Sequence, residues 1–575
     1  MVITRISLLS IIVLIFSISC RKRALESDNG HLKAAISSGI DSIDPAISYD
    51  TVSGTVVYQV YEQLYQYNYL RRPFTIEPLL AEGMPIISGD KKTVTIKIKK
   101  NVYYHDDPSL PQGRKLRAQD FITQIKRLAF IPTKSTGSWI YENILEGYDQ
   151  FRAEAGTNLK NLEQLEIKGL KAIDDHTLQF KLTRPFPQLK YVLAMSFNSP
   201  IPIESVKFYD NIMETNMIGT GPFFLKKWIK SSKVELERFK NYRNEFYPST
   251  GDRYAHKNQL LNDKGRKIPF LDKITLNVIK EDSTRWLNFR AKKIDYLPIP
   301  KDNFSSVLAG NGEITEKLKS EGVDMQVAPT QTYWWLAFNM EHSILGKNKN
   351  LRKAFAHAID REKLIELFTN NRALKANSIY PPSVFGYESK HKVSFKYDIN
   401  EAKRLLALAG YPNGKGLPEF KFDTRGVSAT NRQQAEFIKS ELKKINVNIR
   451  ISINSFPAYL EKARKGDLEF WIDGWAMDYP DAENSLQLLY SKNHPPGPNS
   501  SYYDSQEFDQ LFDEVKVLQD GADKLKVLNR AHNLVQEDFP WAMLFYTRSY
   551  LLYSKRLKNF RYSSSINNFF KYIKK

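Results

Sequence analysis

The chain has 575 residues, enough for two to four domains at roughly 100–200 residues each, so a small scaffold held together by staples is excluded. A hydrophobic content of 42%, with 33 Phe, 31 Tyr and 8 Trp, excludes wholesale disorder. The 84 Lys and Arg exceed the 64 Asp and Glu, which gives a formal net charge of +20.

The basic residues lie within a few positions of acidic ones almost everywhere, as is typical of solvated faces. No aromatic-basic motif of a nucleic-acid-binding module is present, so we expect no nucleic-acid partner. Positive charge is most concentrated near the C-terminus, at Lys555, Arg556, Lys558, Arg561, Lys571, Lys574 and Lys575.

A short apolar segment precedes the single cysteine. Arg5 is followed by an apolar run over residues 6–16 and then by Ser17-Ile18-Ser19. A core of about a dozen residues is too short to span a bilayer but suits a signal peptide. We therefore expect residues 1–19 to be a cleaved signal peptide and residues 20–30 a flexible tether.

Cys20 stands where the cysteine of a bacterial lipobox would stand, although Ser17 occupies a position where leucine is usual. This placement predicts an exported protein, periplasmic or at the cell surface, held to a bacterial membrane by a lipid on Cys20. The alternative is a plain secretory signal with an incidental thiol. With one cysteine, neither an intramolecular disulfide nor a cysteine zinc cluster is possible.

The first half of the chain mixes strands and helices without a repeat. Alternation of apolar and polar residues with period two predicts strands at 93–99, 176–182, 234–239 and 274–278. Residues 248–269 are polar and lack a period, which predicts a long surface loop.

The second half alternates strands with helices. Residues 333–339 predict a strand buried on both faces, and residues 351–359 an amphipathic helix with Asn350 as its N-cap. Six further elements continue the alternation: helices at 401–409, 432–444 and 458–465, and strands at 419–423, 447–453 and 468–475. This pattern predicts an α/β lobe with a largely parallel sheet. Ligands bind outside the carboxyl ends of such strands, so residues 473–478, at the end of the last strand, are a predicted ligand-binding segment.

Catalytic and metal-binding patterns are not found. The sequence has no Gly-x-Ser-x-Gly elbow, and its nine histidines include no pair at helical ligand spacing. Residues 410–415 weakly suggest a phosphate loop but are better interpreted as a helix stop and turn. We expect no metal or cofactor and no enzyme activity, although sequence alone leaves paired carboxylates for glycoside hydrolysis open.

Several ordered segments together resemble a known family. They are Ser42-Ile43-Asp44-Pro45-Ala46 ahead of 58–64, residues 172–178, Gly219-Thr220-Gly221-Pro222-Phe223, Asn339 with 351–361, and residues 474–481. The set is similar to the extracellular solute-binding proteins of family 5, the oligopeptide- and dipeptide-binding receptors of ABC importers. The resemblance runs from about His31 to the C-terminus and departs at residues 248–269 and at Asn350.

The resemblance implies an α/β periplasmic-binding-protein fold of type II, with two lobes joined by a hinge and an extra α+β domain. By this likeness, lobe I is discontinuous and gathers residues 31–66, 183–329 and 546–575. The extra domain spans 67–182, and lobe II spans 330–545.

The resemblance also implies a monomeric receptor that captures short peptides for ABC permease subunits and performs no chemistry. The main chain of Gly474, Trp475 and Ala476 would pair with the peptide backbone, and Asp478 matches the family's ammonium-binding aspartate. Arg425 is a candidate partner for the peptide carboxylate.

Alternatives stay open both for the roles of single residues and for the function of the whole protein. Asp478 could be only a turn residue before Tyr479-Pro480, and Arg425 a solvated loop arginine. The protein could instead be a receptor for another solute, such as a nickel chelate or an oligosaccharide, or an exported hydrolase on the same fold.

Overall fold

The structure is a computed structural model that describes residues 29–575 except 41, 311, 383, 428 and 496. The predicted signal peptide, Cys20 and most of the tether lie outside the described residues. Among the helices that are described, none is long and apolar enough to cross a membrane.

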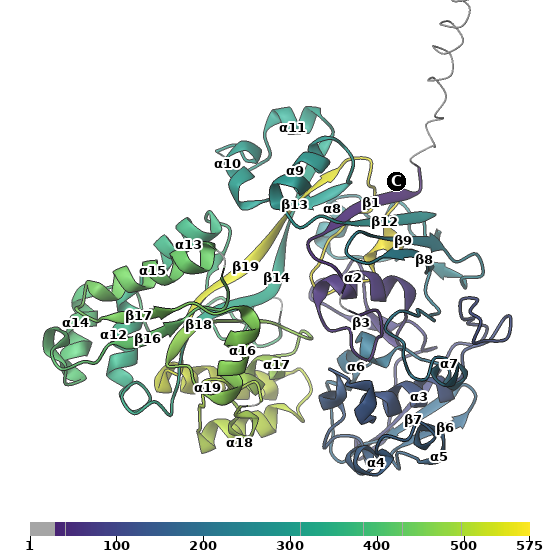
Figure 1. Cartoon of the computed structure of the whole chain (residues 1–575), viewed down its shortest axis with the longest axis horizontal. Helices are drawn as coiled ribbons and strands as arrows, with labels where there is room; N and C mark the ends of the chain where they lie inside the picture. Colours follow the sequence, from purple (N-terminus) through teal and green to yellow (C-terminus); the bar gives the residue numbers. More distant parts are fainter. Residues whose placement is uncertain (1–28, 41, 311, 383, 428, 496) are drawn as a thin grey trace, which may run out of the picture.

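The first lobe is built on a four-stranded sheet in the order β1-β12-β9-β8. Strand β1 (His31–Ile36) lies parallel to β12 (Lys273–Val278), while β9 (Lys233–Arg238) and β8 (Phe223–Ile229) continue the sheet antiparallel. Alternate residues of β9 and β12 are buried, so the strands predicted there are confirmed. The pairing of β1 with β12 brings together segments more than 200 residues apart (Figure 1).

Helix α2 (Thr51–Val60) follows β1 in this lobe. Asp50 is its N-cap and accepts hydrogen bonds from the backbone N–H groups of Val52 and Ser53. This cap fixes where the helix starts and therefore where the preceding loop, residues 48–50, projects.

An extra domain lies below this sheet in Figure 1. Its antiparallel sheet has the order β4-β5-β7-β6, formed by Ile86–Ile87, Thr93–Lys97, Thr177–Lys181 and Leu170–Asp174. The strands predicted at 93–99 and 176–182 are thus confirmed in shortened form. Helix α3 (Ala118–Ala129) packs against β6 and β7.

A buried ion pair joins the extra domain to the N-terminal segment. Arg127 on α3 donates to both carboxylate oxygens of Asp44, at 3.1 and 2.6 Å, and both side chains are at most 1% exposed. Asp44 also accepts from the Ala46 N–H at 2.9 Å. These bonds explain the role of the aspartate in the Ser-Ile-Asp-Pro-Ala segment: it connects the N-terminal segment to the extra domain.

Two long strands link the lobes. Strand β14 (Val323–Phe338) and strand β19 (Trp541–Ser554) pair antiparallel, with a register shift between Pro329 and Tyr333. At one end β19 pairs with β13 (Tyr296–Pro298), next to the first lobe, and at the other end β14 enters the sheet of the second lobe (Figure 1). The shift marks the crossing point between the lobes.

The second lobe continues this sheet in the order β14-β18-β16-β17, with β15 (Leu374–Lys375) on β19. Strand β16 (Phe420–Asp423) is parallel to β17 (Ile449–Ser452) and to β18 (Phe470–Ala476), as predicted. The prediction of a largely parallel sheet is nevertheless wrong, because β14 lies antiparallel to both β18 and β19. Since β14 and β19 cross between the lobes in opposite directions, their pairing has to be antiparallel.

Helices cover both faces of this sheet (Figure 1). One face carries α12 (Lys349–Ala358), α13 (Arg361–Thr369), α14 (Ile399–Leu408) and α15 (Ala429–Lys443), and the other carries α16 (Phe456–Lys465), α18 (Gln506–Val515) and α19 (Ala522–Asp538). The N-cap prediction for α12 is wrong by two residues. Asn348, not Asn350, accepts from the Leu351 N–H at 3.1 Å, so the helix starts at Lys349.

Residues 248–269 are not the bare surface loop that was predicted. They contain α8 (Arg253–Lys257), capped by Asp252, and β11 (Lys267–Ile268), which pairs with β10 (Glu245–Phe246). Asp252 accepts from Arg561 at 2.7 Å, and this contact packs the insertion on the C-terminal segment. These short elements have no apolar periodicity, so the sequence did not predict them. They are stabilised by ion pairs with distant residues, which no local pattern records.

Acidic side chains neutralise the basic C-terminal stretch. Arg561 pairs with Asp252, and three more ion pairs join it to the first lobe: Lys571 to Glu245 at 2.7 Å, Lys574 to Asp263 at 3.1 Å and Lys575 to Asp295 at 2.9 Å. These cations therefore act in folding the tail back onto the first lobe.

Candidate functional site

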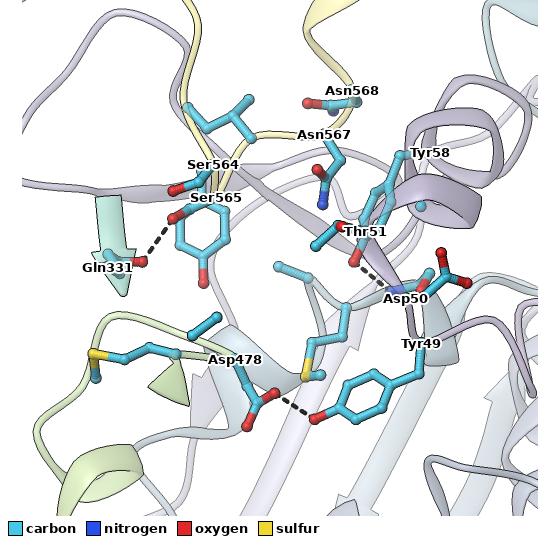
Figure 2. Close-up of a pocket in the computed structure, with 18 of the residues that line it drawn as sticks. Tyr49, Asp50, Thr51, Tyr58, Gln331, Asp478, Ser564, Ser565, Asn567 and Asn568 are labelled. Carbon is cyan, nitrogen blue, oxygen red and sulfur yellow. Dashed lines mark hydrogen bonds between the residues drawn. The ribbon is translucent and has the colours of Figure 1, made fainter. Parts of the chain in front are cut away.

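A cavity of about 380 Å³ lies between the lobes, next to the crossing strands. Five segments that are distant in the sequence line it (Figure 2). They are residues 48–67 around α2, residues 194–197, Gln331 and Thr332 on β14, residues 475–478 at the end of β18, and residues 564–568.

Asp478 meets the first lobe across this cavity. Its Oδ1 accepts a hydrogen bond from the Tyr49 hydroxyl, which Figure 2 shows pointing at the carboxylate. Its Oδ2 accepts from Asn484 Nδ2 at 2.9 Å. The carboxylate therefore has two neutral donors, one from each lobe, and no ion pair with a described residue.

Burial raises the pKa of Asp478, while the hydrogen bonds from Tyr49 and Asn484 lower it. The net direction is upward, because taking an anion out of water costs more than two neutral donors return. Burial and the facing Asp478 also raise the pKa of the Tyr49 hydroxyl, so Tyr49 is the proton donor of the pair.

Asn484 organises the turn that carries Asp478. Its Oδ1 accepts from Trp475 Nε1 at 2.9 Å and from the Asp478 N–H at 3.1 Å, while its amide donates to the carboxylate. Trp475 and Asp478 are thus held in fixed positions relative to each other. Asn484 is fully buried and was not found from the sequence, because its partners lie up to nine residues away.

The predicted site residues separate into two groups. Trp475, Ala476 and Asp478 line the cavity. Gly474 lies one residue before, where an added Cβ would meet the Trp334 ring at 2.6 Å, so glycine is required for close packing on β14. Arg425 is not among the lining residues.

Arg425 is held within the second lobe. Its Nη1 donates to the Gly474 carbonyl at 3.1 Å and lies 3.4 Å from Asp473. Its guanidinium group lies 5.3 Å from the ring centroids of both Trp334 and Tyr459. The carboxylate and the two rings account for its charge within this lobe.

Other lining residues were missed by sequence reasoning. The side-chain oxygen Oε1 of Gln331 accepts from Ser565 Oγ at 2.6 Å, and the Tyr58 hydroxyl accepts from the Ser196 N–H at 2.9 Å (Figure 2). Gln331 belongs to β14 and Ser565 to the C-terminal loop, 234 residues apart. No local pattern reports contacts over such separations.

A second contact joins the lobes beside the cavity. The ring of Tyr479 stacks on that of Tyr191 at 6.0 Å with an interplanar angle of 3°, and Tyr479 is buried in the core of the first lobe. Together with the hydrogen bond from Tyr49 to Asp478, this stack connects the two lobes beside the cavity.

Comparison with known proteins agrees with this geometry. The family model of the bacterial extracellular solute-binding proteins, family 5 (middle region), matches residues 75–497. The chain belongs to this family. The resemblance found in the ordered motifs is therefore confirmed, and so is the fold class it implied.

Two curated relatives show the extent of the likeness. Heme-binding protein A of Haemophilus influenzae is 24% identical over 87% of this chain and 84% of its own length. The oligopeptide-binding protein OppA of Bacillus subtilis is 25% identical over 89% of this chain and 86% of its own length.

A solved structure matches nearly the whole fold. The periplasmic binding protein DppA of Helicobacter pylori, in complex with the peptide STSA, has a TM-score of 0.73 and 26% identity, covering 95% of this chain and 98% of its own. The likeness therefore includes both lobes and the extra domain.

Proposed function

We propose that this protein captures short peptides between its lobes and delivers them to the permease subunits of an ABC importer, without chemistry. The observation that carries this proposal is Asp478, a carboxylate with a raised pKa that faces the inter-lobe cavity and has only neutral donors. The α-ammonium of a peptide would replace the Tyr49 hydroxyl there. Relatives that bind dipeptides and oligopeptides support the same ligand class.

The main chain of β18 supplies the second part of the proposed site. Its residues 474–476 pair with β14 on one side, whereas the β16 pairing on the other side ends at Trp471. The backbone N–H and C=O groups of successive residues point to opposite edges of a strand. The backbone groups of Trp475 therefore point toward β14, and those of Gly474 and Ala476 point toward the open edge. An extended peptide would add to this edge near Ala476, with the Trp475 ring as a wall.

Arg425 remains the sequence's candidate for the peptide carboxylate. To serve in this way it would have to exchange Asp473 for the ligand, since the two now lie 3.4 Å apart. The division into a discontinuous lobe I, an extra domain and lobe II at the sequence-derived boundaries is likewise part of this proposal.

Asp478→Asn tests the proposed ammonium site, because it keeps the shape and removes the charge. Loss of a charge-assisted hydrogen bond of ~1.5–3 kcal/mol weakens Kd by about 10–100-fold. N-acetylation of the peptide removes the same interaction from the ligand side, so the two losses should not add in a double cycle measured by calorimetry. Asp90→Asn, at an exposed turn of the extra domain, is the matched control.

Three outcomes would contradict the proposal. Binding that is equally tight in Asp478→Asn and insensitive to N-acetylation would place the ammonium elsewhere. Native mass spectrometry of protein purified without refolding would show a single sugar or chelate if the ligand class is wrong, and cleaved peptides if the protein is a hydrolase.

Family membership makes this an exported solute-binding protein. We further propose that Cys20 carries a lipid that holds it to a membrane. Cys20→Ser should give an unprocessed or membrane-detached form in fractionation. Wild-type protein without an acyl mass on Cys20 would refute the anchor and leave the peptide site unaffected.

A further inference from the structure

The inter-lobe cavity differs in charge from the rest of the protein. The chain as a whole carries a formal charge of +20, yet the charged residues that line the cavity are Asp50 and Asp478. No Lys, Arg or His lines it among the residues that the structure describes. One of the two carboxylates comes from each lobe, so a ligand enclosed between them meets negative charge on both sides.

Asp50 is able to contribute to this field. Its Oδ1 caps α2 by accepting from Val52 and Ser53 at 2.9 Å, and its side chain is exposed next to Tyr49. Its Oδ2 is not used by the cap. Figure 2 shows the Asp50 side chain beside Tyr49 and Thr51, across the cavity from Asp478.

The nearby arginines do not neutralise this charge. Arg425 interacts with Asp473 and with the Gly474 carbonyl inside the second lobe. Arg548 lies on β19 opposite Pro329, outside the lining set. The carboxylate of a bound peptide would therefore find no cation on the cavity wall.

The rest of the wall is uncharged and combines apolar side chains, such as Met195, Phe197 and Met477, with neutral hydrogen-bonding groups. Gln331 is 4% exposed, and its Nε2 has no hydrogen-bond partner among the described residues. Ser564, Ser565 and Asn567 lie on the same side (Figure 2). Such groups suit an uncharged carbonyl or amide, because a buried donor such as Gln331 Nε2 needs a partner but supplies no countercharge.

Resting on the proposed peptide-receptor function, we propose that this receptor selects cationic peptides and does not depend on a free α-carboxylate. The ammonium binds Asp478, and a basic side chain near the amino end gains from Asp50. The carboxyl end lies against neutral groups, so blocking it as an amide costs nothing. Ligands with a net negative charge, such as glutathione or a heme with its propionates, are disfavoured by the same charges.

Calorimetry with four tripeptides tests this inference: Ala-Ala-Ala, its C-terminal amide, Ala-Lys-Ala and Ala-Glu-Ala. Even in bulk water a unit charge about 6 Å away changes affinity about threefold, and the Lys and Glu peptides differ by two unit charges. We therefore expect Ala-Lys-Ala to bind about tenfold or more tightly than Ala-Glu-Ala. The amide should bind at least as tightly as the free acid.

Asp50→Asn identifies the source of the preference, because asparagine retains the helix cap and removes the charge. The ratio of Lys-peptide to Glu-peptide affinity should fall about threefold or more in this variant and stay unchanged in the control Asp90→Asn. Added salt should reduce the ratio in the wild type.

Three results would overturn the inference. A free acid that binds tenfold more tightly than the amide would show a cationic carboxylate partner, and Arg425→Gln and Arg548→Gln would identify it. Equal binding of the Lys and Glu peptides would refute the charge selection, while leaving the peptide-receptor function in place. If none of the four peptides binds, the receptor function itself fails and the inference falls with it.

Discussion

The hydroxyl of Tyr49 occupies the position where a ligand cation would bind Asp478, which makes Tyr49→Phe the most informative single change. The variant keeps the ring and deletes the donor. Because an ammonium has to displace this hydroxyl, the variant should bind peptides with a free amino group more tightly than the wild type.

The magnitude follows from exposure. A hydrogen bond to a charged group is worth ~1.5–3 kcal/mol when protected. Tyr49 as a whole residue is 46% exposed although its hydroxyl is largely buried, so the bond is only partly protected and a value of ~0.5–1.5 kcal/mol, or about 2–10-fold in Kd, is expected. Removing a bond between the lobes should also enlarge the radius of gyration of the unliganded protein.

Titration calorimetry with a tripeptide and its N-acetylated form measures the effect. The gain should be confined to the free amine, because the acetylated peptide cannot use Asp478. Tyr397→Phe serves as the matched control, since this exposed tyrosine contacts Lys444 on α15's C-terminal side, away from the cavity. Weaker binding of the free amine in Tyr49→Phe would show that the hydroxyl contacts the ligand instead of competing with it.

Two further variants probe the supports of the site. Arg127→Met should lower the free energy of unfolding by ~3–5 kcal/mol in denaturant titrations, because it strands the buried Asp44 without its cation; a loss below ~1 kcal/mol would contradict the buried-pair argument. Burial raises the pKa of Glu483 to about 7, and the ionised form is therefore disfavoured in the folded state, so stability should fall by ~3 kcal/mol as pH rises from about 4.5 to about 7. Glu483→Gln should flatten this pH dependence and stabilise the protein at pH 8, and an unchanged slope in chemical denaturation would refute the assignment.

Sequence patterns correctly predicted those strands and helices whose buried face can be recognised from neighbouring residues alone. The strand at β12 and the helix at α14 were recognised because alternation and amphipathicity report which face of each element is buried. The direction of β14 relative to β18 was predicted wrongly, because strand direction within a sheet depends on where the chain crosses between lobes. The N-cap of α12 was misplaced because Asn348 and Asn350 are equally good caps by residue type, and only the Leu351 N–H distinguishes them.

The same distinction applies to the candidate site: residues close together in the sequence were predicted, and residues that meet only in the folded protein were not. Trp475, Ala476 and Asp478 were found because they lie at the end of one strand and match one family segment, so a short stretch of sequence contains them all. Tyr49 was missed because its role depends on a partner 429 residues away, and nothing near it in the sequence records that the lobes meet there. The charge of the cavity is hidden for the same reason. The cavity is lined by five distant segments, so its charge depends on how the chain folds. The sequence has an excess of 20 positive charges and gives no sign of an acidic cleft. Only in the folded protein is Arg425 paired with Asp473 and the basic tail paired with acids of the first lobe.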